Sequence, residues 1–484
     1  MSSPDSPVST VKMHPSREKI HARAVSGHHT AWRHACVWLT QIVYFGLPWL
    51  QWHDRPAVLF DLATRKFAIF GIVLWPQDLV YLAGLLILCA LLLFFLSALA
   101  GRVWCSFACP HTVYTEIFMW VEQRIEGSRS ARMQLDRLPW SLSKLRKKAI
   151  KHALWIAIAL WTGITFVAYF TPIRTLLAEI VAMALGPWQI FWMAFYAGLT
   201  YLNAGWMREQ VCKHMCAYAR FQSVMFDPDT LLITYDRERG EPRGPLRKNR
   251  HPQAPRQGDC VDCTLCLQVC PVGIDIRDGL QYECLDCAAC IDACDAVMDK
   301  LGRPRGLIRY STGNAMACRL SPRKIRQRLL RPRIMMYGGL LALGIALYFS
   351  ALALRAPLRL NVLPDRGALG QPGADGMLEN VYRLHVMNTD EHPRRFRISV
   401  SGIENARLAD EGWAEVAAAS SRLVPVRVGV PRDQCKPGAS RIWIELIELG
   451  RDGARIREPA MFYMPTGACV ESIEAGEEQE VDRS

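Results

Sequence analysis

The stretch CVDCTLCLQVCP (Cys260–Pro271) has a cysteine spacing that the chain uses again in CLDCAACIDACD (Cys284–Asp295). Each stretch follows the pattern C-x-x-C-x-x-C-x-x-x-C. A 4Fe-4S cluster needs four thiolates, and in paired motifs of this spacing the fourth cysteine of one motif binds the other cluster. We therefore predict two ligand sets, the first being Cys260, Cys263, Cys266 and Cys294, and the second being Cys270, Cys284, Cys287 and Cys290.

Two other roles for these cysteines fit less well. A structural zinc site takes four ligands, commonly from two C-x-x-C pairs, and leaves the third and fourth cysteine of each stretch unused. Disulfides are rare in the reducing cytoplasm. The first stretch ends in Cys-Pro, as in bacterial ferredoxins, whereas Asp295 follows the last cysteine of the second. Because that difference leaves the number of ligands unchanged, we expect a ferredoxin-like domain with two 4Fe-4S clusters over residues 250–310.

The rest of the chain is much more apolar than a ferredoxin. Hydrophobic residues make up 51% of the 484 residues, and uncharged apolar runs of about 18 residues or more are typical of transmembrane helices. We predict a polytopic α-helical membrane protein with five spans, at Ala35–Trp52, Leu79–Gly101, Ala153–Ile173, Gly186–Trp206 and Ile334–Leu354. The shorter runs 66–77 and 175–186 are expected to be interfacial or re-entrant.

The distribution of lysine and arginine predicts the orientation, because cytoplasmic loops are enriched in these residues. Residues 101–151 hold ten of them and residues 319–333 hold seven, whereas the link between the third and fourth spans holds only Arg174. We therefore expect the N-terminus and residues 207–333 in the cytoplasm, and residues 53–78 and the chain after Leu354 outside. This placement accounts for the net charge of +13 without a nucleic-acid partner.

The two ends of the chain differ from its centre. Residues 1–31 are polar and lack the apolar core of a signal peptide, so we expect a disordered cytoplasmic tail. Residues 356–470 contain short alternating stretches between Pro and Gly turns, which predicts a β-sandwich. Its Cys435 and Cys469 would face an oxidising compartment, where either a disulfide or two buried thiols fit. The acidic residues 471–484 are expected to be disordered.

Four further cysteines form two C-x-x-x-C pairs, Cys105 with Cys109 and Cys212 with Cys216. On a helix this spacing puts both sulfurs on one face. The pairs start 107 residues apart, and each follows a two-span hairpin, which indicates an internal repeat within the membrane region 32–206. Four converging thiolates suit a soft ion, namely Cu(I), zinc or an iron–sulfur centre. The alternative is that these cysteines are buried apolar side chains.

The neighbouring histidines His111 and His214 are candidate further ligands for such a metal. An imidazole suits the same soft or borderline ions that thiolates bind.

Several longer stretches together resemble one family. They are VLFDLATRKFAIFG, GRVWCSFACPHTVYTE, REQVCKHMCAYARFQSVMFD, YDRERGEPRG and GIDIRDGLQYECLDCAACIDACDAVM. Over roughly residues 15–484 the chain is similar to the FixG/CcoG (RdxA) family of bacterial cytochrome c oxidase accessory proteins. The resemblance implies a multi-pass protein of the bacterial inner membrane that is needed to assemble the cbb-type oxidase, with an Ig-like C-terminal domain in the periplasm.

The resemblance also implies that the protein reduces Cu(II), with copper associated with the motif formed by Cys105, Cys109 and Pro110. At the second pair Ala217 replaces the proline, a departure from the family pattern. We expect electrons from an unidentified cytoplasmic donor to reach copper held by the four C-x-x-x-C cysteines. A copper exporter or chaperone would then take the Cu(I) to the oxidase assembly machinery.

Two alternative functions stay open at this point. One is quinol-linked electron transfer through the membrane region, although no sequence motif marks a quinone site. The other is a non-catalytic assembly scaffold whose clusters sense the redox state.

Overall fold

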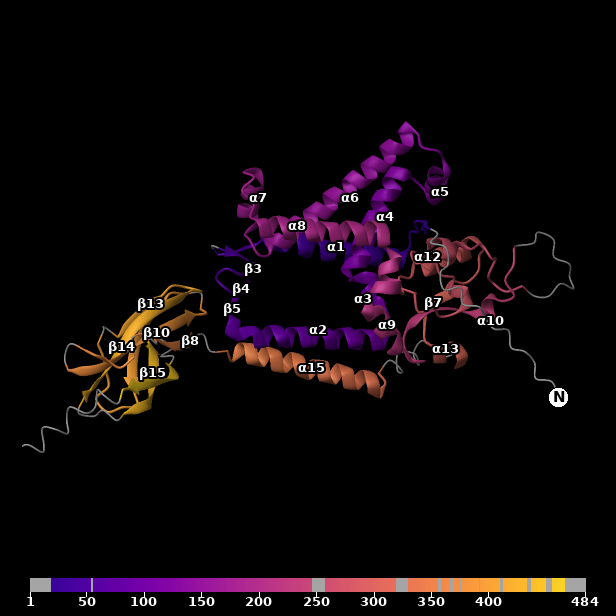
Figure 1. Ribbon diagram of the computed structural model, residues 1–484. Coiled ribbons are helices and arrows are strands. Elements are labelled where there is room, and N and C mark those ends of the chain that lie inside the picture. Colours follow the sequence, from indigo (N-terminus) through magenta and orange to yellow (C-terminus); the bar gives the residue numbers. More distant parts are fainter. Residues whose placement is uncertain are drawn as a thin grey trace, which may run out of the picture. The chain divides into compact units, whose positions relative to one another are not determined.

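The computed structural model describes residues 19–465 except for 54, 246–256, 319–329, 356–357 and loop positions 366, 368, 374–375, 391, 410–411, 433–436 and 450–454. The chain divides into two compact units, one of residues 1–50 and 82–347 and the other of residues 51–81 and 348–484. Helices dominate the first unit and antiparallel strands the second (Figure 1). The predictions for Cys435, Cys469 and the acidic tail lie outside the described residues.

The helices of the membrane region make up most of the first unit. In chain order they are α1 (His28–Gly46), α2 (Leu79–Ala100), α3 (Val103–Phe107), α4 (Pro110–Glu126), α5 (Arg129–Arg137), α6 (Leu142–Ala168), α7 (Ile173–Val181), α8 (Pro187–Thr200) and α9 (Ala217–Val224). The π-helical segments Tyr201–Met207 and Val211–Met215 connect α8 to α9. Within the described parts of the chain, α2, α6 and α15 (Pro332–Ala353) have the length and apolar composition needed to cross a bilayer.

The predicted count of five spans is not confirmed, because two of the predicted runs are interrupted. α1 ends at Gly46, and a 3-10 turn that contains Pro48 follows. Proline lacks the N–H that would continue an α-helix. α8 has only 14 residues before the chain changes to the π-helical Tyr201–Met207. Both helices nevertheless expose large apolar side chains, among them Trp38, Leu39, Ile42, Phe191 and Trp192.

Two other expectations differ from the structure. The run 66–77 is not re-entrant, because β4 (Lys66–Ile69) and β5 (Ile72–Leu74) form an antiparallel sheet with β3 (Val58–Asp61). The predicted N-terminal tail is too long, because residues 19–27 bind the rest of the first unit. The backbone N–H of Arg23 donates to the carbonyl of Gln268 at 2.8 Å. Contacts of this kind fix the segment before α1 begins at His28.

A buried ion-pair network connects the N-terminal segment with α4 and α6. The side chain of Glu122 on α4 is fully buried, and its carboxylate lies 2.7 Å from Arg208, 3.3 Å from Lys19 and 3.6 Å from Lys151. Burial opposes ionisation of Glu122, but the three cations outweigh it and hold the pKa of this carboxyl far below its usual value. Because Arg208 stands four residues before Cys212, the network also holds the backbone that leads into the second C-x-x-x-C pair.

The cluster domain of the first unit consists of short elements. β6 (Leu232–Tyr235) pairs with β7 (Ile308–Ser311), and α11 (Leu265–Val269) packs against α12 (Ala289–Lys300). The other helices are α10 (Arg237–Gly240) and α13 (Gly313–Cys318).

Asp292 of α12 caps the start of α1. Its carboxylate accepts hydrogen bonds from the backbone N–H of His29 at 3.2 Å and of Thr30 at 2.7 Å. An acidic side chain stabilises the free N–H groups at a helix start, so this cap docks the cluster domain onto α1.

The C-terminal part of the second unit is a sandwich of two antiparallel sheets, as predicted. The strand order is β12-β14-β10-β8 in one sheet, with β9 beside β10, and β13-β11-β15-β16 in the other. The strands are β8 (Leu358–Pro364), β9 (Gln371–Pro372), β10 (Met377–Asn388), β11 (Arg394–Ser401), β12 (Arg407–Leu408), β13 (Trp413–Val416), β14 (Ser421–Pro431), β15 (Gly438–Glu448) and β16 (Arg455–Met464). Aromatic side chains fill the core, where Tyr382, Phe396 and Phe462 are fully buried.

Residues 51–81 pack against this sandwich. They form β1 (Gln51–Trp52), β2 (Arg55–Pro56) and the β3–β5 sheet. Trp75 packs against Met387, and the buried carboxylate of Asp78 pairs with Arg355 and with Arg359, the latter at 2.8 Å.

Candidate functional site

The two cysteine stretches fold around two small cavities. One is lined by Cys260, Cys263, Cys266 and Cys294. The other is lined by Cys270, Cys284, Cys287 and Cys290, and Cys266 lines it as well. The structure therefore brings the fourth cysteine of each stretch together with the first three of the other stretch. These are the two crossed sets expected from the spacing.

The two stretches have the same unusual backbone. Asp262 and Thr264 have φ angles of 51° and 55°, and the equivalent Asp286 and Ala288 have φ angles of 54° and 58°. Residues other than glycine rarely adopt such left-handed angles. Both C-x-x-C steps therefore turn in the same way beside their cavities.

The chemistry of both cavities fits a 4Fe-4S cluster. In the first set, burial raises the pKa of Cys266 to about 11 and that of Cys294 to about 12. In the second set, burial raises the pKa values of Cys284 and Cys290 well above their ordinary value. These thiols would therefore lose their protons only when a cationic group binds, which is how metal binding couples to proton release. When bound, such clusters supply one-electron transfer.

Each C-x-x-x-C pair bends at its second cysteine, so the expectation that both sulfurs share one helix face is wrong. α3 carries Cys105 and ends at Phe107, before Cys109. The π-helical Val211–Met215 carries Cys212 and ends before Cys216. Cys109 and Cys216 are extended, with φ/ψ of −64°/124° and −78°/106°, and stand directly before α4 and α9.

The bend at Cys109 has a local cause in Pro110, because a proline disfavours the helical conformation of the residue before it. The second pair lacks this proline, since Ala217 stands there. Cys216 nevertheless has nearly the same extended conformation. The extended conformation of Cys216 therefore forms without a proline after it.

The four sulfurs of these pairs gather in one region, which we term the thiolate site. Burial and then the charges of Cys109, Cys212 and Cys216 raise the pKa of Cys105 to about 12, with Arg102 acting in the opposite direction. Among the described residues, no three His, Cys, Asp or Glu side chains are close enough to bind one metal ion together. The four thiols thus lie near one another, but no three of them surround one position for a metal ion.

The two candidate histidines lie at the edge of this site. His111 Nε2 donates a hydrogen bond to the carbonyl of Arg208 at 2.9 Å, so its other ring nitrogen is the one left for a ligand. His214 lies on the π-helical segment beside Cys212 and is exposed.

Gln222 of α9 positions the thiolate site, and no sequence signal marked it. This side chain is fully buried. Its Nε2 donates to the carbonyl of Gly101 at 2.7 Å and to Ser97 Oγ at 3.1 Å, and its Oε1 accepts from Cys105 at 3.5 Å. Gln222 therefore connects the second repeat to the first cysteine of the first repeat.

Asp286 connects the thiolate site to the cluster domain. It stands between Cys284 and Cys287, where an aspartate would be expected to face water, but it is buried. Its carboxylate accepts hydrogen bonds from the backbone N–H of Arg102 at 3.0 Å and of Ile233 at 3.4 Å. Because Arg102 stands three residues before Cys105, the second cluster loop is fixed directly to the first C-x-x-x-C pair.

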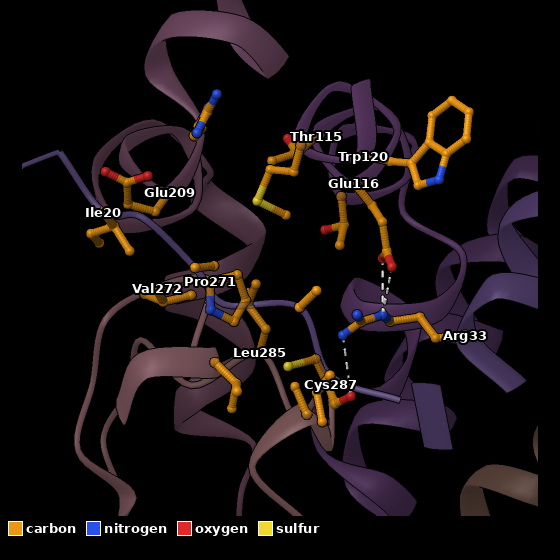
Figure 2. A pocket seen from close by; sticks show the side chains of 18 of the residues that line it. Ile20, Arg33, Thr115, Glu116, Trp120, Glu209, Pro271, Val272, Leu285 and Cys287 are labelled. Carbon is orange, nitrogen blue, oxygen red and sulfur yellow. Dashed lines mark hydrogen bonds and ion pairs between the residues drawn. The ribbon is translucent and has the colours of Figure 1, made fainter. Parts of the chain in front are cut away.

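A cavity of about 150 Å³, which we term the Arg33 cavity, borders both centres. Cys212 of the thiolate site and Cys287 of the second cluster set both line it. Figure 2 shows Arg33 between the carboxylate of Glu116 and the backbone carbonyl of Cys287. The Nε atom of Arg33 lies 2.9 Å from the Glu116 carboxylate, and its Nη1 atom lies 3.5 Å from the carbonyl oxygen of Cys287. The thiolate site and the second cluster set thus face one shared space.

Family models match three parts of the chain. Residues 207–313 match a 4Fe-4S dicluster domain, residues 82–128 match a 4Fe-4S binding domain, and residues 348–465 match the Ig-like fold at the C-terminus of FixG. The match over residues 82–128 includes Cys105 and Cys109.

Curated relatives are similar over most of the chain. RdxB of Cereibacter sphaeroides is 39% identical, and the alignment covers 93% of this chain and 97% of RdxB. The nitrogen fixation protein FixG of Rhizobium meliloti is 38% identical, and the alignment covers 88% of this chain and 86% of FixG. A crystal structure of a FixG-related protein from Vibrio parahaemolyticus aligns with 20% identity and a TM-score of 0.21, covering 23% of this chain and 98% of that one. The chain belongs to the FixG/RdxA family of iron–sulfur proteins.

Proposed function

We propose that this protein is a membrane-bound oxidoreductase that reduces Cu(II) to Cu(I) at the thiolate site during assembly of a cbb-type cytochrome c oxidase. The observation that carries the proposal is the clustering of Cys105, Cys109, Cys212 and Cys216 beside a domain built for two 4Fe-4S clusters. Thiolates prefer soft Cu(I), so a thiolate site favours the reduced product. The bound clusters would supply single electrons, and each Cu(II) takes up one.

Contacts between the two centres support this function. Asp286 binds the backbone before Cys105, and the Arg33 cavity is bordered by both Cys212 and Cys287. A substrate ion at the thiolate site would therefore lie beside the cluster domain.

The proposal includes a location and partners. We place the protein in the bacterial inner membrane, with the N-terminus and the clusters in the cytoplasm and the C-terminal domain in the periplasm. The lysine- and arginine-rich segments support this orientation. The Cu(I) would pass to a copper exporter or chaperone that serves the oxidase.

A copper-reduction assay tests the proposal. Purified protein is reduced with dithionite, freed of excess reductant and mixed anaerobically with Cu(II), and the Cu(I) formed is measured with a Cu(I)-specific chelating dye. Wild type should form Cu(I). A Cys105→Ala/Cys109→Ala variant should keep the EPR signals of the two clusters and lose copper reduction. The matched control is Cys89→Ala, which removes an exposed cysteine of α2. A double variant that reduces Cu(II) as wild type does would overturn the proposal.

One observation favours a second occupant of the thiolate site. The 4Fe-4S binding model covers Cys105 and Cys109, and four thiolates can also hold an iron–sulfur centre. Iron analysis distinguishes the two, because two clusters give about eight iron atoms per chain and a third gives about twelve. If the Cys105→Ala/Cys109→Ala variant loses iron instead of copper, the site extends the electron path and does not bind the substrate.

A further inference from the structure

Arg33 of α1 is a buried cation at the cavity that borders both the thiolate site and the second cluster set. Only 12% of its side chain is exposed, and only 13% of the side chain of its ion-pair partner, Glu116 of α4. A buried ion pair adds little stability, because the loss of water offsets the attraction between the charges. The pair is therefore better explained by the groups that its charge faces than by a contribution to folding.

The charge of Arg33 faces the second cluster set. Arg33 Nη1 donates a hydrogen bond to the backbone carbonyl of Cys287 at 3.5 Å, and Cys287 lines the second cluster cavity as well as the Arg33 cavity. Burial opposes the charge of Arg33, but the charges of Cys287 and Glu116 outweigh burial and raise the pKa of the guanidinium. Arg33 therefore stays charged beside a cluster-binding cysteine.

The counter-charge of Arg33 lies on the side away from Cys287. Figure 2 shows Arg33 between Glu116 and Cys287. Because a Coulomb interaction weakens with distance, the nearer cation outweighs the more distant carboxylate at Cys287. The carboxylate of Asp292 also acts on Arg33, but it is already bound by backbone N–H groups at the start of α1. The Arg33–Glu116 pair thus presents its positive end to the second cluster cavity.

An arginine also lines the first cluster cavity, but its charge is more fully balanced. Arg277 pairs with Asp275 at 2.6 Å and also with Asp262. Arg33 has Glu116 as its ion-pair partner. The two arginines therefore differ in how much positive charge they present to their clusters.

The position of Arg33 matches the exit of the electron path. Among the described residues that line the Arg33 cavity, the cysteines are Cys212 of the thiolate site and Cys287 of the second cluster set. The second set, and not the first, thus shares a cavity with the thiolate site. The charge of Arg33 acts on the cluster from which an electron would leave for that site.

From these contacts we propose that Arg33 raises the reduction potential of the second cluster and so holds an electron at the exit of the path. Reduction adds one negative charge to the cluster, and nearby charges and hydrogen bonds set the potential of such clusters. The electron comes from the first cluster, which is oxidised in the same step, and no proton moves. Arg33 acts through its charge and not as a ligand. The inference rests on the proposed function only for the destination of the electron.

A redox titration followed by EPR tests the proposal on the cluster-loaded full-length protein without copper. Arg33→Gln should favour the oxidised second cluster about tenfold, which lowers its potential by about 59 mV. Glu116→Gln removes the counter-charge and should raise the same potential. Arg33→Lys keeps the positive charge and should stay closer to wild type than Arg33→Gln does. A disturbed structure would not give shifts of opposite sign at the two members of one ion pair.

Two further variants make the measurement specific. Cys263 lines the first cluster cavity only, so Cys263→Ser shows which of the two potentials belongs to the first cluster. The matched control is Arg305→Gln, which removes an exposed arginine of the same domain that pairs with Asp299 at 2.7 Å. Because water screens an exposed charge, this control should leave both potentials unchanged.

The proposal is wrong if Arg33→Gln and Glu116→Gln shift the second potential in the same direction, if neither shifts it, or if only the first potential moves. Iron content checks that each variant holds its clusters, and if Arg33→Gln loses iron, the rise in Glu116→Gln decides alone. Protein that reduces Cu(II) without these shifts would overturn the role of Arg33 and leave the proposed function standing. Protein that shows the shifts but never reduces Cu(II) would overturn the proposed function and leave the role of Arg33 standing.

Discussion

Replacing Gly101 by alanine should weaken the junction between the thiolate site and the cluster domain without removing a cysteine. Gly101 joins α2 to α3 with a φ of 56°, and a left-handed conformation costs other residues roughly 1–2 kcal/mol. An added Cβ would lie 2.4 Å from Leu232 Cδ2 and 2.7 Å from Asp286 Oδ2. Both neighbours are buried, so neither has free space into which it can move.

The second clash falls on a hydrogen bond. The same carboxylate oxygen of Asp286 accepts the backbone N–H of Arg102 at 3.0 Å. Displacing it leaves a buried N–H unpaired, at a cost of roughly 1–3 kcal/mol. Added to the backbone strain, the expected loss in the free energy of unfolding is about 2–5 kcal/mol.

Thermal unfolding in detergent measures this loss, and the rate of Cu(II) reduction by pre-reduced protein measures the weakened junction. The unfolding temperature and the rate of Cu(II) reduction should both be lower in Gly101→Ala than in wild type. The control is Gly339→Ala on α15, where an added Cβ meets nothing within 4 Å. The reasoning is refuted if Gly101→Ala unfolds at the wild-type temperature and reduces Cu(II) at the wild-type rate.

Two more predictions concern the ligand sets and the buried carboxylate. Cys294→Ser should remove the first cluster and Cys270→Ser should remove the second, because each of these cysteines lies in the cavity of the other stretch. EPR of the reduced proteins identifies the cluster that remains. Loss of the second cluster in Cys294→Ser and of the first in Cys270→Ser would contradict crossed ligation. Glu122→Gln should cost about 3–5 kcal/mol, because it leaves Arg208 and Lys151 without their buried counter-charge. Since the pKa of Glu122 is held below its unfolded value, its stabilisation is complete above about pH 4.3 and is lost as the pH falls. Wild type should therefore lose more stability in acid than the variant, and equal losses in thermal unfolding against pH would contradict this.

The cluster cavities could be predicted because their geometry depends on local sequence. Each stretch has its own turns, and Thr264 and Ala288 have the same left-handed backbone at equivalent positions. The membrane spans were harder to predict, because composition does not determine where a helix stops. The apolar run that begins at Ala35 continues past Gly46, but the helix does not.

The thiolate site could be located from the repeat, but its supports could not. The spacing of the pairs identified the four cysteines, and the bends at Cys109 and Cys216 depend on helix ends that the spacing does not reveal. Gln222 contacts Cys105 across 117 residues, and Asp286 contacts Arg102 across 184. Pairs so distant in sequence leave no periodic signal, because the two residues become neighbours only in the folded chain.

The positions of Asp286 and Asp292 link the binding of iron–sulfur clusters to the binding of copper at the thiolate site. Asp286 lies between two cysteines of the second cluster set and fixes the backbone before Cys105, and Asp292 follows Cys290 of the same set and caps α1. Binding of a metal group to its cysteines stabilises the conformation of their loop. A protein that has lost the second cluster would therefore hold both carboxylates less firmly and lose order at the thiolate site, although all four of its thiols are intact. Copper should accordingly bind the iron-loaded protein more tightly than the iron-free one, and the difference should come from the second cluster.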